Sequence, residues 1–290
     1  MSAPSAPPPS SRRVVDPLFT RLEAFYDAVP RDRAGAEQIG PFVLFVPDGP
    51  GLPLYARPLI GGGSGGASLS DVEAVRARQR ELELPEAFEW VHETTPWVLP
   101  LVEGAGLSVL KAPLMVLGPD GVREATAPGA TVRLLDPEQP DFAAGVAAFR
   151  TIAALAFGSP GTAPGPVGAL ERDAALRAPD AAEAEREASR VASQRAAYAI
   201  AETEDEGALA GGAYQRVGPV AEIVGVATLP AARRRGLGAA VTAALAQRAH
   251  ATGADLIFLS AGNDDVARLY ARLGFRRVGT ACIASPPAGA

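Results

Sequence analysis

A run of arginines and glycines at residues 233–239 has the composition of a phosphate-binding turn. It follows an apolar, β-branched stretch at 221–229 that predicts a strand, and it leads into an amphipathic pattern at 237–250 that predicts a helix. The first N–H groups of a helix lack partners and lie at the positive end of its dipole, which favours anions. Gly236 and Gly238 let the backbone approach a diphosphate without an intervening Cβ. We therefore expect a pyrophosphate-containing cofactor to bind here.

The spacing of this turn distinguishes among the known nucleotide-binding signatures. The dinucleotide fingerprint requires a third glycine, where this chain has Val241, and an acidic residue that ends the next strand, whereas Asp255 precedes it. The P-loop requires a lysine after its last glycine, and none stands nearby. The pattern that fits is R-x-x-G-x-G, read from Arg233 through Gly236 to Gly238.

This pattern resembles the acetyl-CoA signature of the GNAT superfamily of N-acetyltransferases. Residues 263–275 are similar to the family's N-x-x-A-x-x-L-Y-x-x-x-G-F segment, with one departure, Val266, where alanine is usual. Asn263 is expected to cap a helix in this segment, and Tyr270 is expected on the face of that helix that packs on a sheet. The match of both segments, in the right order, makes the resemblance specific.

The resemblance covers roughly residues 131–283 and is most specific from 221 to 279. It implies the GNAT fold, an α/β architecture. Helices flank its sheet, which is twisted and mixes parallel and antiparallel strands, as in α+β proteins. Further strands of this half are predicted at residues 131–135, 196–202, 208–215, 256–259 and 275–283, and further helices at 141–157 and 181–193.

The first half of the chain predicts a similar order of elements. Its strands are expected at residues 42–46, 54–56, 87–91 and 107–117, and its helices at 16–28, 70–82 and 95–103. The second helix would begin with a capping box formed by Ser70 and Glu73. We interpret the chain as a tandem protein of two related halves.

The first half lacks both the R-x-x-G-x-G turn and the asparagine–tyrosine helix, so it is interpreted as a degenerate copy that binds no cofactor. Its glycine-rich segment at residues 61–66 is either a phosphate cradle or a flexible connection, and the composition favours the connection. The predicted division is a disordered tail at 1–14, a degenerate GNAT-like domain at 15–125 and an acetyl-CoA-binding GNAT domain at 126–290. The chain ends soon after its last predicted strand, so the first half is expected to supply the missing edge of the second.

The resemblance implies which residues hold acetyl-CoA. The backbone of the arginine–glycine turn would bind the pyrophosphate, and the end of the preceding strand would pair with the pantetheine arm. The arginine side chains either add charge near the phosphates or are solvated, and Asn263 either fixes the cofactor or only caps its helix. The predicted cofactor-binding residues are Val226, Ala227, Thr228, Arg233, Arg234, Arg235, Gly236, Leu237, Gly238, Ala239 and Asn263.

The resemblance also implies direct transfer of an acetyl group to a primary amine in a ternary complex. Glu222 would be the base, because it stands on a strand eleven positions ahead of Arg233, as in the histone-acetyltransferase branch, and apolar neighbours would raise its pKa. Tyr270 would be the acid that protonates the leaving thiolate. The structural alternatives are an exposed strand end for Glu222 and a merely packed aromatic ring for Tyr270.

The sequence leaves the acceptor open between a small-molecule amine and a peptide amine. The acidic run at 202–206 would suit a cationic amine, although solvated surface is the commoner reason for such runs. Small residues, Gly225 and Ala227, also leave room for a longer acyl donor. The alternative function is a non-catalytic acyl-CoA-binding regulatory protein.

The composition excludes several classes of protein. The net charge is −6 and the basic residues are scattered, which argues against a nucleic-acid partner. The single cysteine, Cys282, excludes an intrachain disulfide framework and suits a reducing compartment. No run of about 20 apolar residues predicts a membrane span, so we expect a cytoplasmic protein. His92 and His250 stand without further metal ligands, so no metal is expected.

Overall fold

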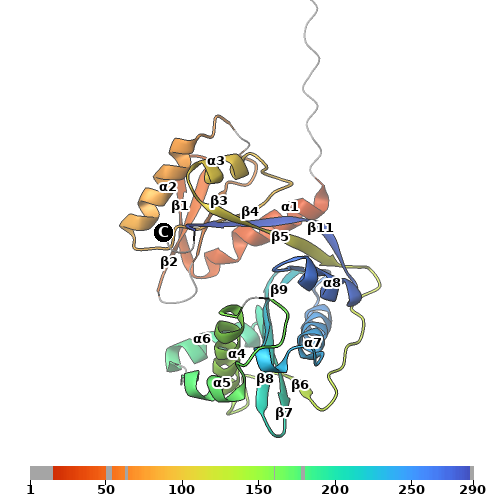
Figure 1. Ribbon diagram of the computed structural model, residues 1–290. Helices are drawn as coiled ribbons and strands as arrows, with labels where there is room; N and C mark the ends of the chain where they lie inside the picture. Colours follow the sequence, from red (N-terminus) through yellow and green to blue (C-terminus); the bar gives the residue numbers. More distant parts are fainter. Residues whose placement is uncertain (1–15, 50–53, 63–64, 160, 178–179, 288–290) are drawn as a thin grey trace, which may run out of the picture.

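The computed structural model of the chain describes residues 16–49, 54–62, 65–159, 161–177 and 180–287 (Figure 1). The helices are α1 (Pro17–Ala28), η1 (Pro30–Asp32), α2 (Leu69–Glu81), α3 (Val98–Gly104), α4 (Phe142–Phe157), α5 (Ala169–Ala175), α6 (Ala181–Ala192), η2 (Pro230–Ala232), α7 (Leu237–Ala251) and α8 (Asp264–Arg272). The strands are β1 (Ala34–Ile39), β2 (Phe42–Pro47), β3 (Ala56–Pro58), β4 (Phe88–Val91), β5 (Ser108–Leu117), β6 (Thr131–Leu134), β7 (Ala196–Thr203), β8 (Gly207–Val217), β9 (Val220–Thr228), β10 (Leu256–Ser260) and β11 (Phe275–Ser285). The predicted tail at 1–14 lies outside these residues.

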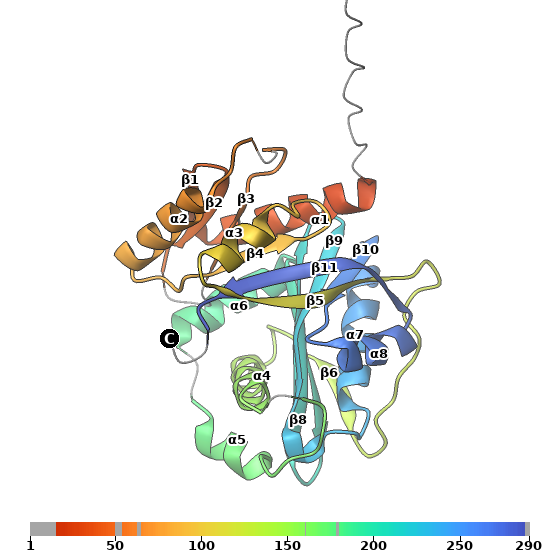
Figure 2. The same ribbon diagram turned by 45° about the horizontal axis from the view of Figure 1, so that its top comes forward.

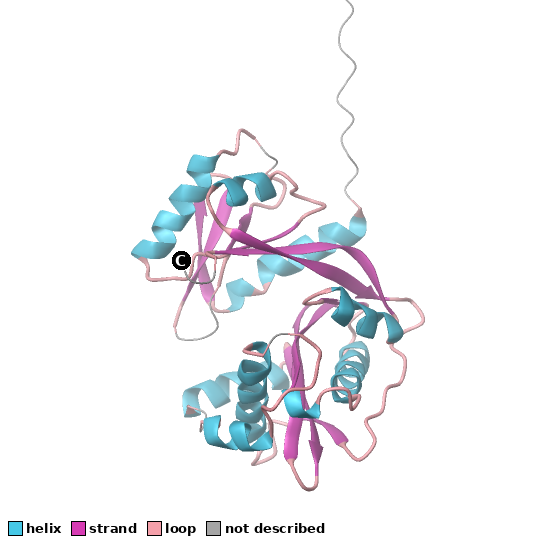
Figure 3. Ribbon diagram, in the orientation of Figure 1, coloured by secondary structure: helices cyan, strands magenta, loops and turns pink. Residues whose placement is uncertain are grey.

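All strands of the described residues join one mixed sheet in the order β1-β2-β3-β4-β11-β5-β10-β9-β8-β7-β6. Most neighbours are antiparallel, whereas β3 pairs with β4 and β9 pairs with β10 in parallel. Helices lie on both faces of this sheet (Figure 3). The mixed, helix-flanked architecture expected from the sequence is therefore confirmed.

The two halves of the chain exchange strands at the centre of the sheet. Strand β5 of the first half lies between β10 and β11 of the second half, and β11 in turn lies between β5 and β4. Figure 1 shows the blue β11 running beside the yellow β5 where the two parts of the molecule meet. The expectation that the first half supplies an edge for the second is confirmed, and the exchange is mutual. The division of the chain at residue 125 stays a prediction.

Several apolar clusters form the core of the described residues. The largest packs α4 and α7 against β7, β8 and β9, with Ile152, Val241 and Leu245 fully buried. A second cluster packs α2 and α3 against the strands of the first half, and a third places α1 over β5, β9 and β10. Because α1 packs against strands of both halves, it links the two halves (Figure 2).

Two predictions for local elements are wrong, and two elements were not predicted. The capping box of α2 is formed by Ser68 and Asp71, two residues earlier than the predicted Ser70 and Glu73. Helix α3 begins at Val98, not at residue 95, because the preceding residues form a turn. Strand β1 and helix α5 were not predicted, since both are short and largely exposed and show no apolar periodicity.

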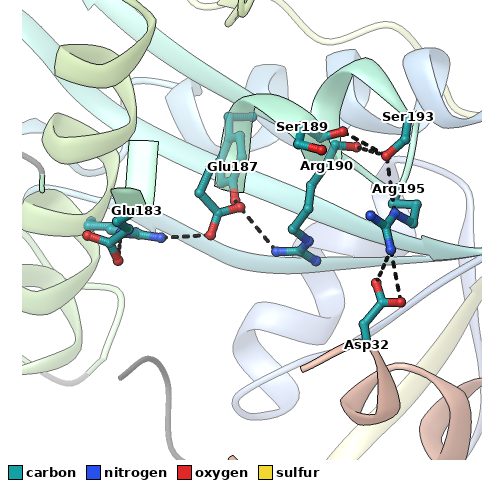
Figure 4. A network of polar contacts seen from close by, with 9 residues as sticks. Asp32, Glu183, Glu187, Ser189, Arg190, Ser193 and Arg195 are labelled. Atoms are coloured by element: carbon teal, nitrogen blue, oxygen red, sulfur yellow. Dashed lines mark hydrogen bonds and ion pairs between the residues drawn. The ribbon is translucent and has the colours of Figure 1, made fainter. Parts of the chain in front are cut away.

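Helix α6 is anchored by a network of charged groups (Figure 4). Glu187 is 9% exposed and accepts hydrogen bonds from the Tyr198 hydroxyl at 2.5 Å, from Arg150 at 3.0 Å and from Arg190 at 3.1 Å. Just after this helix, Arg195 donates to both carboxylate oxygens of Asp32 in η1 at 2.9 Å. The network therefore fixes α6 on β7 and adds a second polar link between the two halves.

Within the described residues, no helix combines the length and the apolar character needed to cross a membrane.

Candidate functional site

Strands β9 and β10 part shortly after they meet. Their parallel register runs only from Val220 opposite Leu256 to Glu222 opposite Phe258. Strand β9 continues to Thr228, and on its other side it stays paired with β8. The backbone groups of β9 beyond Glu222 therefore lack a strand partner on the β10 side, which leaves an opening edge for an extended ligand.

A bulge reshapes β9 where the two strands separate. The register between β8 and β9 shifts between Gly211 and Ala213, opposite the segment that contains Gly225. Gly225 has a φ of +64°, which L side chains rarely adopt, and a Cβ there would lie 3.0 Å from the ring of Phe149. The bulge turns the end of β9 toward the start of α7.

The predicted arginine–glycine turn leads into α7 with its first amides open. Gly236 is the N-cap with a φ of +82°, and a Cβ on it would lie 3.0 Å from the Thr126 carbonyl oxygen. In the described part of the chain no side chain caps α7, and its first turn holds no acidic residue. The free N–H groups and the helix dipole fit an anionic group such as a diphosphate.

The side chains of the three arginines have structural partners. Arg233 donates to the carbonyl oxygens of Ala156, Ser159 and Ala163 at 2.6–3.1 Å, which holds the segment after α4 against η2. Arg234, with a φ of +68°, donates to the Thr162 carbonyl oxygen at 3.2 Å. Arg235 forms an ion pair with Glu206 at 2.9 Å. These contacts shape the turn, and they occupy the side chains that were expected either near the phosphates or in solvent.

A cavity of about 1190 Å³ connects this turn with the opening between β9 and β10. Most of the predicted site residues line it: Glu222, Val226, Ala227, Thr228, Arg233, Arg234, Gly236, Leu237, Gly238, Ala239, Asn263 and Tyr270. Arg235 does not line it and points instead to Glu206. The structure thus brings the predicted base, acid and cofactor turn together around one space.

Glu222 is the buried carboxyl of this cavity, with 8% of the residue exposed. Its Oε2 accepts a hydrogen bond from Gln215 Nε2 at 2.9 Å, and its Oε1 accepts one from the Tyr26 hydroxyl at 3.5 Å. Burial raises the pKa of Glu222 from 4.5 to about 7, and the hydrogen bonds from Gln215 and Tyr26 lower it by less. Glu222 is therefore not an exposed strand end, and its carboxyl exchanges a proton near neutral pH.

Tyr270 lies on the inner face of α8, with 7% of the residue exposed, and its ring packs edge-on against Phe275 at 6.0 Å between ring centroids. Burial raises the pKa of Tyr270 to about 12, and a hydrogen bond with Thr242 lowers it by less. The phenol therefore keeps its proton at neutral pH, which suits a proton donor. Tyr270 is therefore both a packed aromatic residue and a residue that lines the cavity.

Asn263 caps α8, since its Oδ1 accepts a hydrogen bond from the Val266 N–H at 3.0 Å. The residue also lines the cavity. The capping role is thus confirmed, whereas its role in holding a cofactor stays a prediction.

Sequence reasoning missed four residues that lie around Glu222. Gln215 faces Glu222 across the β8–β9 hairpin, and the turn at 218–219 would have given this register, because both residues are equally far from it. Tyr26, Tyr55 and Glu89 come from the first half and line the same cavity. No local sequence signal marks these three, because the exchange of strands places them there.

Among the described residues, no group of three or more histidine, cysteine, aspartate or glutamate side chains is arranged to hold a metal ion.

Comparisons with known proteins agree with this geometry. A family model described as "Acetyltransferase (GNAT) family" matches residues 169–275, which span α5 to the start of β11. The matched segment includes Glu222, the arginine–glycine turn and Tyr270. A search of curated proteins finds no match to the chain.

Two solved structures share the fold over most of the chain. A GCN5-related N-acetyltransferase from Kribbella flavida is 23% identical, with a TM-score of 0.63, over 93% of this chain and 95% of that one. A GCN5-related N-acetyltransferase from Sphaerobacter thermophilus is 18% identical, with a TM-score of 0.55, over 89% of this chain and 84% of that one. The similarity extends across both halves, so the fold of the whole chain recurs in these proteins.

Proposed function

We propose that the chain, whose residues 169–275 match the model of the acetyltransferase (GNAT) family, transfers an acetyl group from acetyl-CoA to a primary amine in a ternary complex. The observation that carries the proposal is the position of Glu222. Its carboxyl, with a pKa raised to about 7, lines the same cavity as the uncapped start of α7.

The residues present fit acetyl-CoA, which supplies an activated acetyl thioester when bound. The open amides at the start of α7 would bind its pyrophosphate, since no carboxylate competes for them in the described part of the chain. The unpaired edge of β9 from Val226 to Thr228 would hydrogen-bond the pantetheine arm as an added strand does. Arg235 pairs with Glu206 and so orients the turn. We also propose that Arg235 contacts the cofactor directly.

Glu222 acts as the general base in this proposal. An amine reacts through its lone pair, so the proton of an ammonium group must leave before or during attack. Glu222 accepts that proton, and Gln215 holds its Oε2 in place. A carboxyl with a pKa of about 7 is matched to this exchange at neutral pH.

Tyr270 acts as the general acid. The amine nitrogen forms a bond to the acyl carbon, and the carbon–sulfur bond breaks with both electrons moving to sulfur. Tyr270 gives its proton to that sulfur. The second proton that the nitrogen loses as the amide forms restores the Tyr270 phenol, and the proton held by Glu222 returns to solvent. Since burial raises the pKa of Tyr270 to about 12, the phenol is protonated when it is needed.

Glu222→Gln tests this proposal because it keeps the hydrogen-bonding shape and removes the base. We expect kcat to fall about 100-fold or more, in the range of a lost general base, with the affinity for acetyl-CoA unchanged. The measurement follows the release of free thiol with a panel of amines, and calorimetry reports the affinity. Glu204→Gln, at an exposed residue of the acidic run, is the matched control and keeps wild-type rates.

The pH profile provides a second readout of the same variant. The wild-type kcat/KM rises with pH through an inflection near 7, because only the ionised form of Glu222 accepts a proton. The Glu222→Gln variant lacks that inflection. Binding of acetyl-CoA without turnover on any amine would instead support the alternative, a non-catalytic acyl-CoA-binding regulator.

A further inference from the structure

Glu89, on β4 of the first half, is a second carboxyl at the Glu222 end of the cavity. It is half-buried, and among the described residues no group forms a hydrogen bond or ion pair with its carboxylate. The other carboxylate that lines the cavity, Asp265, is already paired with Arg268 at the start of α8. Glu89 is therefore the carboxyl near Glu222 that has no internal partner in the described part of the chain.

Two tyrosines, Tyr26 and Tyr55, line the cavity together with Glu89 and Glu222. The Tyr26 hydroxyl donates to Glu222 Oε1 at 3.5 Å, and the Tyr55 hydroxyl donates to the Tyr26 carbonyl oxygen at 3.3 Å. After burial, the charges of Glu222 and Glu89 both raise the pKa values of Tyr26 and Tyr55. The charges of both carboxyls thus act on both tyrosines, which line the same cavity.

The environment of Glu89 disfavours a lone negative charge. Burial and, to a smaller extent, the nearby charge of Glu222 raise the pKa of Glu89 to about 8, and the charge of Arg57 lowers it by less. A cation bound against Glu89 reverses both effects, because it supplies the missing partner for the ionised carboxylate.

Arg33 also lines the cavity, where its charge acts on Tyr55 and not on Glu89. The cation whose charge acts on Glu89 is Arg57, and that charge is already balanced. Its side chain is 1% exposed, pairs with the Glu23 carboxylate and donates to the Glu23 carbonyl oxygen at 3.1 Å. Thr94 donates to the same carboxylate, which fixes this pair within the first half. The charge that remains for a ligand is therefore that of Glu89.

We propose that Glu89 binds a second ammonium group of the acceptor, so that the preferred acceptors are diamines or amines that carry a further cationic group. This inference rests on the proposed acetyl transfer. One carboxylate serves each nitrogen: Glu222 takes the proton from the attacking nitrogen, and Glu89 holds the other nitrogen in its protonated form. A single carboxylate cannot do both for one nitrogen, because an ammonium group held in an ion pair has no lone pair to attack with. The first half of the chain thus determines the acceptor.

Three acceptors of equal chain length test the proposal: pentane-1,5-diamine, 1-pentylamine and 5-aminopentanoate. Each is assayed with acetyl-CoA and wild-type protein by following free thiol. We expect kcat/KM for the diamine to exceed that for the monoamine by about 10- to 100-fold, the range of a hydrogen bond to a charged group. The aminocarboxylate should be the poorest acceptor, because its carboxylate faces Glu89. A series of diamines of three to six carbons then gives the spacing between the two nitrogens.

Glu89→Gln separates specificity from catalysis. We expect the variant to lower kcat/KM for the diamine by about 10- to 100-fold and to leave the monoamine within about twofold of wild type. Glu185→Gln, an equal change of charge on the exposed side of α6, should leave both acceptors unchanged. A thermal shift with pentane-1,5-diamine alone reports binding without turnover, and the shift seen with wild type should be lost in Glu89→Gln.

The outcomes distinguish this inference from the proposed function. Equal kcat/KM values for the diamine and the monoamine, or a preference for the aminocarboxylate, overturn the role of Glu89 while acetyl transfer stands. A Glu89→Gln variant that keeps the preference for the diamine overturns it as well. Acetylation of no amine by wild type overturns both together.

Discussion

Helices α7 and α2 begin at similar places beside the sheet, but only α2 has a carboxylate in its first turn. Helix α7 follows β9 beside the parallel strand β10, and α2 follows β3 beside the parallel strand β4. The start of α7 has no capping side chain in the described residues and no acid in its first turn. The start of α2 is closed by Asp71, whose Oδ2 accepts the backbone N–H of Ser68 at 2.8 Å and its hydroxyl at 2.7 Å. The same geometry therefore offers a phosphate site in one half and none in the other.

This difference supports the prediction that the glycine-rich segment before α2 is a connection and not a second cofactor site. The segment at 61–66, of which 63 and 64 lie outside the described residues, was left open between a phosphate cradle and a connection. A carboxylate at the third helical position occupies the amides that a phosphate would need and repels a second anion. We infer that capping, more than loop composition, separates the two halves.

The largest expected effect comes from giving α7 the charge that α2 carries. Ala239 holds the third position of α7, as Asp71 does in α2, so Ala239→Asp places a carboxylate at the open amides. We expect the affinity for acetyl-CoA to fall about 100-fold, because like charges brought together cost several kcal/mol. Calorimetric titration with acetyl-CoA measures the loss.

Ala239→Asn is the matched control for this change, since it adds nearly the same volume without the charge. The melting temperature of Ala239→Asp should stay at or above that of wild type, because an acid in the first turn of a helix stabilises it. An Asp variant that binds acetyl-CoA as tightly as the Asn variant would show that the start of α7 is not the phosphate site.

A second difference between the halves concerns the helix that faces the cavity. Helix α8 carries Tyr270, whereas α3, at the corresponding place of the first half, has the sequence VLPLVEG and no tyrosine. We expect Tyr270→Phe to lower kcat by about 10- to 100-fold, the low end for a general acid, because a thiolate leaves readily. Steady-state assays measure kcat, and the affinity for acetyl-CoA should not change. A variant with wild-type kcat would leave Tyr270 as a packed aromatic only.

Charge in the cavity makes the stability of the first half depend on pH. The pKa of Glu89 is raised to about 8 in the folded chain from 4.5, so the folded form holds the proton more tightly. This contribution to stability is complete below pH 4.5 and is lost as pH rises through 8. Gln carries no charge, so Glu89→Gln should be more stable than wild type at pH 8.5, with no difference near pH 4.5.

Denaturant unfolding at several pH values checks the sign of this effect. Glu185→Gln on α6 removes an exposed carboxyl and should not change the free energy of unfolding at either pH. If the Glu89→Gln variant lost stability at high pH relative to wild type, the carboxyl would have a stabilising partner, and its role as a free ligand for a cation would be wrong.

The smallest effect is expected from opening the start of α2. Asp71→Asn removes the charge of the capping box, and we expect a loss of about 1 kcal/mol in the free energy of unfolding. Acetyl-CoA affinity and kcat should stay at wild-type values, because α2 lies outside the cavity lining. A change in either kinetic value would mean that the first half also contacts the cofactor.

The second half of the fold was predictable because its signals are local. The turn that contains Gly236 has to follow a strand and start a helix, and α7 begins at Leu237 as expected. Glu222 and Tyr270 were found because each lies at a fixed distance from such a signal. Strand β1 was missed because it is an edge strand of mostly polar and small residues, and α5 was missed because it is short and largely exposed.

The acceptor end of the site was not predictable from local patterns. Tyr26 lies on α1 and Glu89 on β4, far from Glu222 along the chain. They reach the cavity only because β5 and β11 exchange places in the sheet, and no periodicity or spacing in one sequence specifies that pairing. Pairing between distant strands is decided by the packing of the whole sheet.

The exchange of β5 and β11 also constrains how the polypeptide matures. The first half cannot complete its sheet until residues 275–285 have been translated and have left the ribosome. Until then the edges of strand β5 are unpaired and exposed to solvent. Early pairing with β10 would cover one of these edges. A gene split between the halves would accordingly yield two fragments that each need the other to become folded.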